Sequence, residues 1–373
     1  MITFNNNIFK IDTKNTSYII RISKFNHLLT DYYGKYIPSQ ENYEFSKEKY
    51  DTMGGCSVWY SESDVTYGLD SMSMEVSSVG KGDYKEPSLI IDNGNDFILD
   101  LLYVDYQINE ATTPLDTLPT PHGNLQELVI NLKDRYLDIH VSLHYLVDED
   151  NDVIAKNVVI TNKMENNIVI NKAMSMQLEL VNQEFTLVNL YGGWGFEGQK
   201  SKNTLGRGIF INDSKTGTSS HRHNPFFMLK AKDATYNTGN VYSFNLLYSG
   251  NHYEMVEVSS FNKVRIQSGI NPHCFKYTLK QNEVFEAPYA ILTFSDLGSN
   301  GASQNMHRFI SAHILKEVHK NVSAPILINN WEATYMKFKE STLHAIINNA
   351  KDLKLEMFVL LMIACNVDSL NFI

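Results

Sequence analysis

Apolar and polar side chains alternate along many short segments between the start of the chain and about residue 300. In residues 137–145 every odd-numbered position is apolar and every even-numbered position is polar. Strict alternation is typical of a β-strand with one buried face. Residues 173–180 repeat the pattern, and polar clusters such as 148–152 and 237–240 mark turns between such segments. Many short strands without a long helical pattern predict a large antiparallel β-sandwich.

The pattern changes near residue 300. Apolar side chains follow helical spacing over 306–314 and again over 343–353. A short apolar strand is predicted at Pro325–Asn330, between these two helices, and another begins at Met357. A strand, a helix and a second strand in this order form a parallel βαβ unit, which predicts the opening of an α/β domain.

The composition narrows the classes of function. A net charge of −10 and an isoelectric point near 5.6 argue against binding to nucleic acid and to anionic membranes. The longest apolar run, Met357–Cys365, is shorter than the ~20 residues that span a bilayer, and no signal peptide is visible at the N-terminus. Three widely spaced cysteines, Cys56, Cys274 and Cys365, form no CxxC pair or disulfide framework. We therefore expect a cytoplasmic protein.

Two tryptophans are candidate sugar-binding residues, because an aromatic face stacks on the apolar C–H face of a pyranose. Trp331 follows the predicted strand Pro325–Asn330, at the end where α/β barrels bind ligands. Trp194 lies in a loop with three glycines, which is typical of an exposed binding loop. The alternatives are structural: Trp331 would pack on a helix, and Trp194 would form a lid on the core.

Other candidate chemistry is weaker. His221 and His223 are two residues apart, as a metal pair on a strand can be, but no third ligand stands nearby. We expect no metal and no cofactor. The spacing of the carboxylates singles out no acid/base pair; those considered are Asp83, Glu86, Glu197 and Glu332. The residues alone thus predict a β-sandwich, the start of an α/β domain and two sugar-facing tryptophans, without selecting a function.

Several motifs in a fixed order resemble those of one enzyme family. They are "GLDSMSMEVSSVGKGDYKEPSL" (68–89), "NLYGGWG" (189–195), "SSHRHNPFF" (219–227), "LLYSGNHYEMVEV" (246–258), "GINP" (269–272), "TFSDLGSNGASQNMHRF" (293–309) and "PILINNWEATYMKF" (325–338). Together they resemble bacterial α-galactosidases of glycoside hydrolase family 36, the melibiase and raffinase type. The resemblance covers residues 1 to about 360.

The resemblance implies an N-terminal β-supersandwich over 1–322, ending in a linker helix, and the first βαβ unit of an incomplete (β/α)8 catalytic barrel over 323–373. It also implies hydrolysis of terminal α-linked galactose with retention, by a nucleophilic aspartate and an acid/base aspartate. In the family both aspartates lie on later barrel strands. We therefore expect no catalytic residue within this chain, and a fragment that is truncated early in the barrel and inactive alone.

The family also assigns roles to the two tryptophans. Trp331 matches the pocket tryptophan of the motif Asn-Trp-Glu-Ala-Thr-Tyr. Trp194 matches a loop tryptophan that reaches the galactose site of a neighbouring subunit in tetrameric members. The implied partners are an α-galactoside substrate and further copies of the chain, as a homo-oligomer. The alternative function is a non-catalytic carbohydrate-binding or assembly module.

The chain departs from the family pattern at three places. The sequence "GFEGQK" replaces basic residues after Trp194, and Asp64-Val65-Thr66-Tyr67 replaces Asp-Arg-Thr-Phe. Leu361-Met362-Ile363-Ala364 replaces the Asp-Asp-Gly-Trp that follows the second barrel strand.

Overall fold

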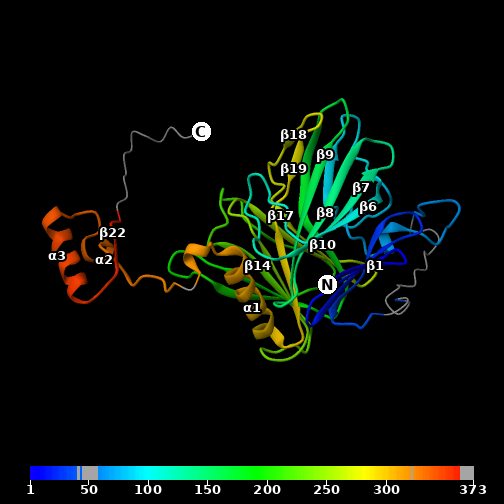
Figure 1. Ribbon diagram of the computed structural model, residues 1–373. Coiled ribbons are helices and arrows are strands. Elements are labelled where there is room, and N and C mark those ends of the chain that lie inside the picture. Colours follow the sequence, from blue (N-terminus) through cyan, green and yellow to red (C-terminus); the bar gives the residue numbers. More distant parts are fainter. Residues whose placement is uncertain (40–42, 44–57, 321, 362–373) are drawn as a thin grey trace. The chain divides into compact units, whose positions relative to one another are not determined.

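The computed structural model describes residues 1–39, 43, 58–320 and 322–361, and the chain divides into two compact units, Met1–Ile314 and Leu315–Ile373 (Figure 1). The first unit is built mainly from antiparallel strands, and helices are few among the described residues. The predicted fold class, a mostly β sandwich followed by a βαβ unit, is confirmed.

Within the described residues, the largest sheet has ten strands. Nine run in the order β12-β11-β14-β15-β20-β9-β8-β7-β6, and β19 pairs with β9. Their bounds are β6 (Leu101–Asn109), β7 (Gln126–Asp134), β8 (Ile139–Asp148), β9 (Val153–Asn162), β11 (Thr186–Tyr191), β12 (Gln199–Thr204), β14 (His223–Lys230), β15 (Val241–Leu246), β19 (Val284–Glu286) and β20 (Ala290–Ser295). The alternation over 137–145 is realised in β8, where Val141 is buried and His140 is half-buried.

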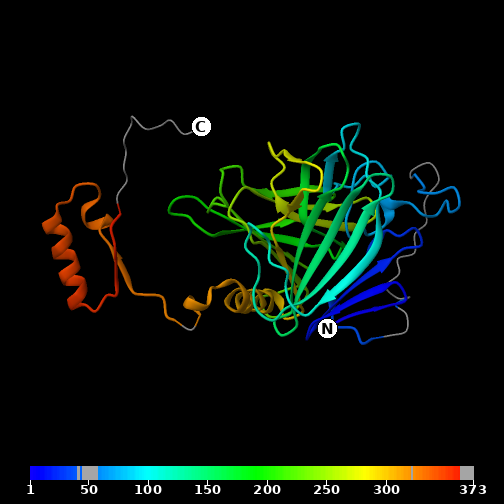
Figure 2. The ribbon, with the colours of Figure 1, turned by 45° about the horizontal axis from the view of Figure 1, so that its top comes forward.

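Two further antiparallel sheets pack against this large sheet. One is a meander of β1 (Ile2–Asn5), β2 (Ile8–Asp12), β3 (Thr16–Ile22) and β4 (Leu28–Lys35). The other runs β13-β16-β17-β10-β18, with β5 beside β10; its bounds are β5 (Leu89–Asp92), β10 (Ile168–Val181), β13 (Gly208–Asp213), β16 (His252–Val258), β17 (Lys263–Ile270) and β18 (Tyr277–Leu279). Both ribbon views show the blue meander beside the cyan and green strands of the large sheet (Figures 1 and 2).

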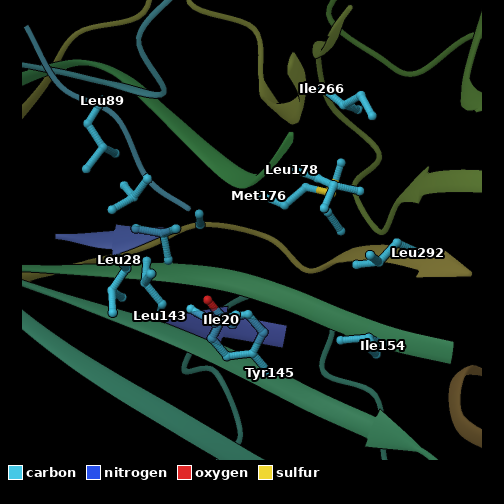
Figure 3. Close-up of a cluster of buried hydrophobic side chains, with 14 of the residues drawn as sticks. Ile20, Leu28, Leu89, Leu143, Tyr145, Ile154, Met176, Leu178, Ile266 and Leu292 are labelled. Atoms are coloured by element: carbon cyan, nitrogen blue, oxygen red, sulfur yellow. The ribbon is translucent and has the colours of Figure 1, made fainter. Parts of the chain in front are cut away.

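The main hydrophobic core contains side chains from all three sheets. Figure 3 shows Ile20 of the meander near Leu143 and Tyr145 of the large sheet, with Leu178 and Ile266 of the other sheet also in the cluster. These five residues are at most 4% exposed. Sheet-on-sheet packing through alternating inward side chains therefore holds the first unit together.

Helix α1 (Gly298–Phe309) follows the last strand of the large sheet. It begins at Gly298, whose φ is +66°, and a Cβ there would lie 2.6 Å from the backbone of Tyr236. The helix buries Met306 and Phe309 against Tyr289 and its neighbours in the large sheet, which confirms the predicted apolar face. A π-helical turn, Ile310–Ile314, and a 3₁₀ turn, Glu317–His319, follow it. Another 3₁₀ turn spans Leu69–Ser71 in the first unit.

The second unit contains the predicted strand, helix and strand. Strand β21 (Leu327–Asn329) is followed by the short helix α2 (Trp331–Thr334) and by α3 (Glu340–Asp352), and then comes β22 (Met357–Val359). The two strands pair in parallel, with Leu327 opposite Met357. Parallel pairing through a helical crossover is the unit from which a (β/α)8 barrel is built.

The expected cytoplasmic location rests on the apolar runs and on the cysteines of the chain. No helix among the described residues is long and apolar enough to cross a membrane. In the part of the chain that the structure describes, Cys274 is exposed and in no disulfide. Cys56 and Cys365 lie outside the described residues.

One buried carboxylate links all three sheets. Glu75 lies in the irregular segment before β5 and is 2% exposed. It accepts hydrogen bonds from the hydroxyl of Tyr18 on β3 at 2.6 Å and from the hydroxyl of Tyr145 on β8 at 2.8 Å. Its cation is Lys156 of β9, whose Nζ also donates to the backbone oxygen of Gln177 on β10 at 2.8 Å. Burial lowers the pKa of Lys156, and Glu75 offsets part of that effect.

A second buried network anchors the same irregular segment to β10 and β17. The guanidinium of Arg265 is fully buried and bonds Glu179 at 2.6 Å and Asp83 at 2.5 Å. Lys172 pairs with Glu86 at 2.7 Å. Asp83 and Glu86, two of the carboxylates considered for acid/base chemistry, are therefore occupied by structural cations.

We expect Lys156→Met to destabilise the protein by about 3–5 kcal/mol, because it leaves the Glu75 carboxylate buried without a cation. The free energy of unfolding, measured by urea denaturation, checks this. The double variant with Glu75→Gln should recover part of the loss.

The matched control is Lys232→Ala. Lys232 pairs with Glu184 at 2.6 Å, but both side chains are about 70% exposed (72% and 69%), so solvent screens the pair. We expect no measurable change there. A loss below about 1 kcal/mol for Lys156→Met would contradict the role given to the buried pair.

Candidate functional site

The hairpin between β11 and β12 carries Trp194 at its tip. The side chain of Trp194 is 93% exposed, and that of Phe196 nearby is 70% exposed. Gly195 has a φ of +77°, and its N–H donates to Oε1 of Glu197 at 3.0 Å. The backbone groups of Gly193 and Phe196 bond each other at 2.9 and 3.3 Å. A hydrogen-bonded turn thus presents two aromatic rings to solvent, and Trp194 does not form a lid on the core of this chain.

A buried polar chain fixes the base of this hairpin. The amide of Asn189 on β11 donates to Oδ1 of Asn212 on β13 at 3.2 Å, and Asn212 donates to Oε2 of Glu254 at 2.8 Å. Glu254 in turn bonds Nδ1 of His252 at 2.9 Å, and Nε2 of His252 lies 2.8 Å from the backbone oxygen of His223 on β14. The chain crosses from the large sheet to its neighbour and back, so it sets the position of the hairpin on the sandwich.

The hydrogen bond between His252 and Glu254 favours the protonated form of His252. Burial alone would lower the pKa of His252, but its hydrogen bond to Glu254 and the charge of Glu254 raise it above the usual 6.5. Burial raises the pKa of Glu254. By contrast, burial lowers the pKa of His223, which is half-buried beside Tyr191. His221 is exposed, and no group of three or more His, Cys, Asp or Glu side chains among the described residues is placed to hold a metal ion.

Trp331 lies in the second unit, directly after β21. It is half-buried, and its ring meets that of Tyr335 edge-on with 5.6 Å between centroids. The backbone N–H of Trp331 donates to Oδ1 of Asn329 at 2.9 Å. The neighbouring Asn330 is fully buried, and its Oδ1 accepts from the N–H of Leu361 at 2.8 Å. Asn330 thereby joins the carboxyl ends of the two parallel strands, the edge at which α/β barrels bind ligands.

The remaining candidate carboxylates serve local structure. Glu197 stabilises the Trp194 turn, and the N–H groups of Glu197 itself and of Gly195 lower its pKa. Glu332 lies 3.5 Å from the hydroxyl of Tyr335. Asp64, where the family pattern has its Asp-Arg-Thr-Phe, accepts from the N–H of Thr66 at 2.9 Å and pairs with Lys24. Of the departure at Leu361-Met362-Ile363-Ala364, all but Leu361 lies outside the described residues.

Sequence reasoning missed two residues of these sites. Phe196 is a second exposed aromatic beside Trp194, and its position in the glycine-rich loop was a usable signal. The sequence pattern predicts Asn330 only as the last residue of a strand. Its bridge to Leu361 joins positions 31 residues apart, which no local pattern reveals. Trp194 and Trp331 belong to different compact units, so the two predicted site residues are described separately.

The His252–Glu254 pair predicts a pH-dependent stability. A raised pKa means that the folded state binds the proton more tightly than the unfolded state, so the stabilisation is complete below pH 6.5 and is lost as pH rises through the higher folded-state pKa. We expect the melting temperature to fall more steeply between about pH 6 and pH 8 in the wild type than in Glu254→Gln, measured by circular dichroism. Equal pH slopes for the two proteins would contradict this assignment.

Comparison with known proteins confirms the resemblance drawn from the motifs. The model of the glycosyl hydrolase family 36 N-terminal domain matches residues 26–280, and the melibiase model matches residues 284–361. The α-galactosidase Mel36A of Lactobacillus acidophilus is 34% identical over 363 residues, which are 95% of this chain and 49% of the relative. The bifunctional α-galactosidase/sucrose kinase AgaSK of Mediterraneibacter gnavus is 33% identical, over 95% of this chain and 38% of the relative.

Solved structures agree. The α-galactosidase of Lactobacillus brevis matches with a TM-score of 0.92 and 33% identity, covering 96% of this chain and 49% of the other. A variant of AgaA from Geobacillus stearothermophilus in complex with raffinose matches with a TM-score of 0.90 and 29% identity, covering 94% of this chain and 49% of the other. The chain thus spans about half the length of the relatives it matches, or less. On the match of the N-terminal domain model over residues 26–280, the chain belongs to glycoside hydrolase family 36.

Proposed function

We propose that this chain is part of an α-galactosidase that removes terminal α-linked galactose, with retention, from oligosaccharides of the melibiose and raffinose type. Residues 1–322 would form its β-supersandwich, and 323–373 would open its (β/α)8 barrel. The observation that carries the proposal is Trp331, in its family motif, at the carboxyl edge of a parallel strand pair. The same chain aligns with an α-galactosidase over 95% of its length.

The proposed role of Trp331 is to stack on the apolar face of galactose. Its edge-on contact with Tyr335 and the bridge from Asn330 to Leu361 support this role, because they restrain the strand ends around the ring. Retaining hydrolysis needs two carboxyl groups about 5–5.5 Å apart. The candidate carboxylates Asp83, Glu86, Glu197 and Glu332 are engaged elsewhere, so the proposal places the nucleophile and the acid/base outside residues 1–361.

The proposed role of Trp194 lies in a homo-oligomer, where it would reach the sugar site of a neighbouring copy. Its 93% exposure at the tip of a hydrogen-bonded turn supports this role, since the ring has no partner surface within the described part of its own unit. We also propose a cytoplasmic location. The exposed thiol of Cys274, which forms no disulfide in the described residues, fits a reducing compartment.

We expect the 373-residue chain alone to show no hydrolysis of p-nitrophenyl α-galactoside. Residues 1–360, fused to the part of Lactobacillus acidophilus Mel36A that begins directly after its second barrel strand, should hydrolyse that substrate. In the fusion, Trp331→Ala should lower kcat/KM about tenfold to a hundredfold, because stacking of roughly 1.4–2.8 kcal/mol is lost.

The matched control is Trp59→Phe, since Trp59 is the third tryptophan and lies in neither candidate site. It should leave kcat/KM unchanged. Hydrolysis by the 373-residue chain alone would contradict the placement of the catalytic pair. A fusion that unfolds cooperatively on heating, yet cleaves no α-galactoside, would overturn the proposed function.

A second candidate function, a non-catalytic carbohydrate-binding module, is favoured by the two exposed rings of Trp194 and Phe196. The variant Trp59→Phe/Trp331→Phe leaves Trp194 as the sole tryptophan. A saturable change in its fluorescence on adding raffinose to this chain would support the module. We expect no change, because a sugar site needs several walls to bury its ligand; Trp194→Phe added to the same variant gives the background.

A further inference from the structure

A cavity that neither Trp194 nor Trp331 lines lies between helix α1 and one end of the large sheet. Its volume is about 500 Å³, and every residue that lines it belongs to the unit Met1–Ile314. The cavity falls in the size range of small-molecule pockets, about 300–1,000 Å³. Neither the motifs nor the proposed galactosidase function assigns anything to it.

The floor of this cavity is apolar. Strand β11 contributes Val188 and Leu190, strand β14 contributes Phe226 and Met228, and Met306 and Ile310 come from α1 and the π-helical turn after it. Val188, Met228 and Met306 are each less than 8% exposed, so the floor is part of the packed interior. Methionine side chains adapt to ligands of irregular shape.

Three lysines stand on the same face as this floor. Lys200 pairs in register with Leu190, and Lys202 pairs with Val188, so both lysines point to the same side of the sheet as their partners. Lys230 is two residues beyond Met228 on β14 and shares its face. The ammonium groups of Lys200 and Lys230 lie 5.4 and 5.5 Å from the centre of the Tyr236 ring.

These lysines repel one another without an acidic partner. Among the described residues, no Asp or Glu lines the cavity, and the charged groups that act on Lys230 are the other two lysines and Tyr236, although the chain carries a net charge of −10. Burial lowers the pKa of Lys230, and the charges of Lys202 and Lys200 lower it further. Lysines on an edge strand such as β12 also discourage strand pairing between molecules. That explanation does not cover Lys230, which lies on the interior strand β14.

We propose that this cavity binds an amphiphilic anion: a phosphate or similar dianionic head on a compact apolar body. The head would lie among Lys200, Lys202 and Lys230, whose mutual repulsion it would offset, and the body would lie on the apolar floor. Ser299, Ser303 and His307 of α1 also line the cavity and supply polar contacts at its rim. A neutral sugar uses this cavity less well, since it has no charge to place among the three lysines and the floor of the cavity is apolar.

Isothermal titration of the 373-residue chain with 1-naphthyl phosphate tests the proposal. We expect saturable binding at one site, weakened at least fivefold by Lys230→Gln and at least fivefold by Lys202→Gln. The matched control is Lys276→Gln, which removes the same charge from an exposed lysine outside the cavity. It should leave the affinity unchanged. Thermal unfolding of each variant confirms that the fold is intact.

Two further ligands test separately how much the anionic head and the apolar body contribute to binding. Inorganic phosphate and 1-naphthol should each bind at least tenfold more weakly than 1-naphthyl phosphate, and added salt should weaken the phosphate ester more than the alcohol. Binding of the ester that Lys230→Gln and Lys202→Gln leave unchanged would overturn the proposal. The absence of any binding of the ester would also overturn the proposal; this would be the result if a second copy of the chain covered the cavity. None of these readouts depends on galactosidase activity.

Discussion

The interaction on which the rest of the structure depends is the buried contact of Glu75 with Lys156. Through Tyr18, Tyr145 and the backbone of Gln177, this pair touches strands of all three sheets at one point. Bringing two charges out of water is expensive, and their attraction offsets that cost only when the geometry is good and the other lone pairs are satisfied. The carboxylate oxygens of Glu75 find their hydrogen-bond donors and their cation on several strands at once. A different arrangement of the sheets would leave a charge buried and unpaired.

The same principle places the hairpin that carries Trp194. The polar chain from Asn189 through Asn212 and Glu254 to His252 connects β11 with β13 and β16, so the base of the hairpin cannot shift without breaking buried hydrogen bonds. The tip is held only by its own turn and remains open to solvent. A fixed base and an exposed aromatic tip are the properties that a hairpin needs if it is to present a side chain to a separate surface.

Local sequence patterns predicted the elements of the fold well. Alternation over 137–145 gave β8 with the correct buried face, and helical spacing after residue 300 gave α1 and α3. Local patterns could not predict how the irregular segment before β5 is held, because Arg265 meets Asp83 across 182 positions of sequence. The same limit applies to the lysine-lined cavity, since only the pairing of β11 with β12 places Lys200 and Lys202 on the face of Val188.

At the candidate sugar site, too, some features follow from local sequence and others from contacts between distant residues. The position of Trp331 after a strand and its family motif were visible in the sequence, whereas the bridge from Asn330 to Leu361 depends on parallel pairing. Parallel strands are normally covered on both faces, yet Leu327 is 49% exposed and Met357 is 44% exposed in this chain. Their apolar surface would add stability, at ~25 cal/mol per Å², only when another surface covers it. The ring contact of Trp331 with Tyr335 and the bridge from Asn330 to Leu361 are nevertheless formed while these apolar side chains are exposed, so neither contact depends on that cover.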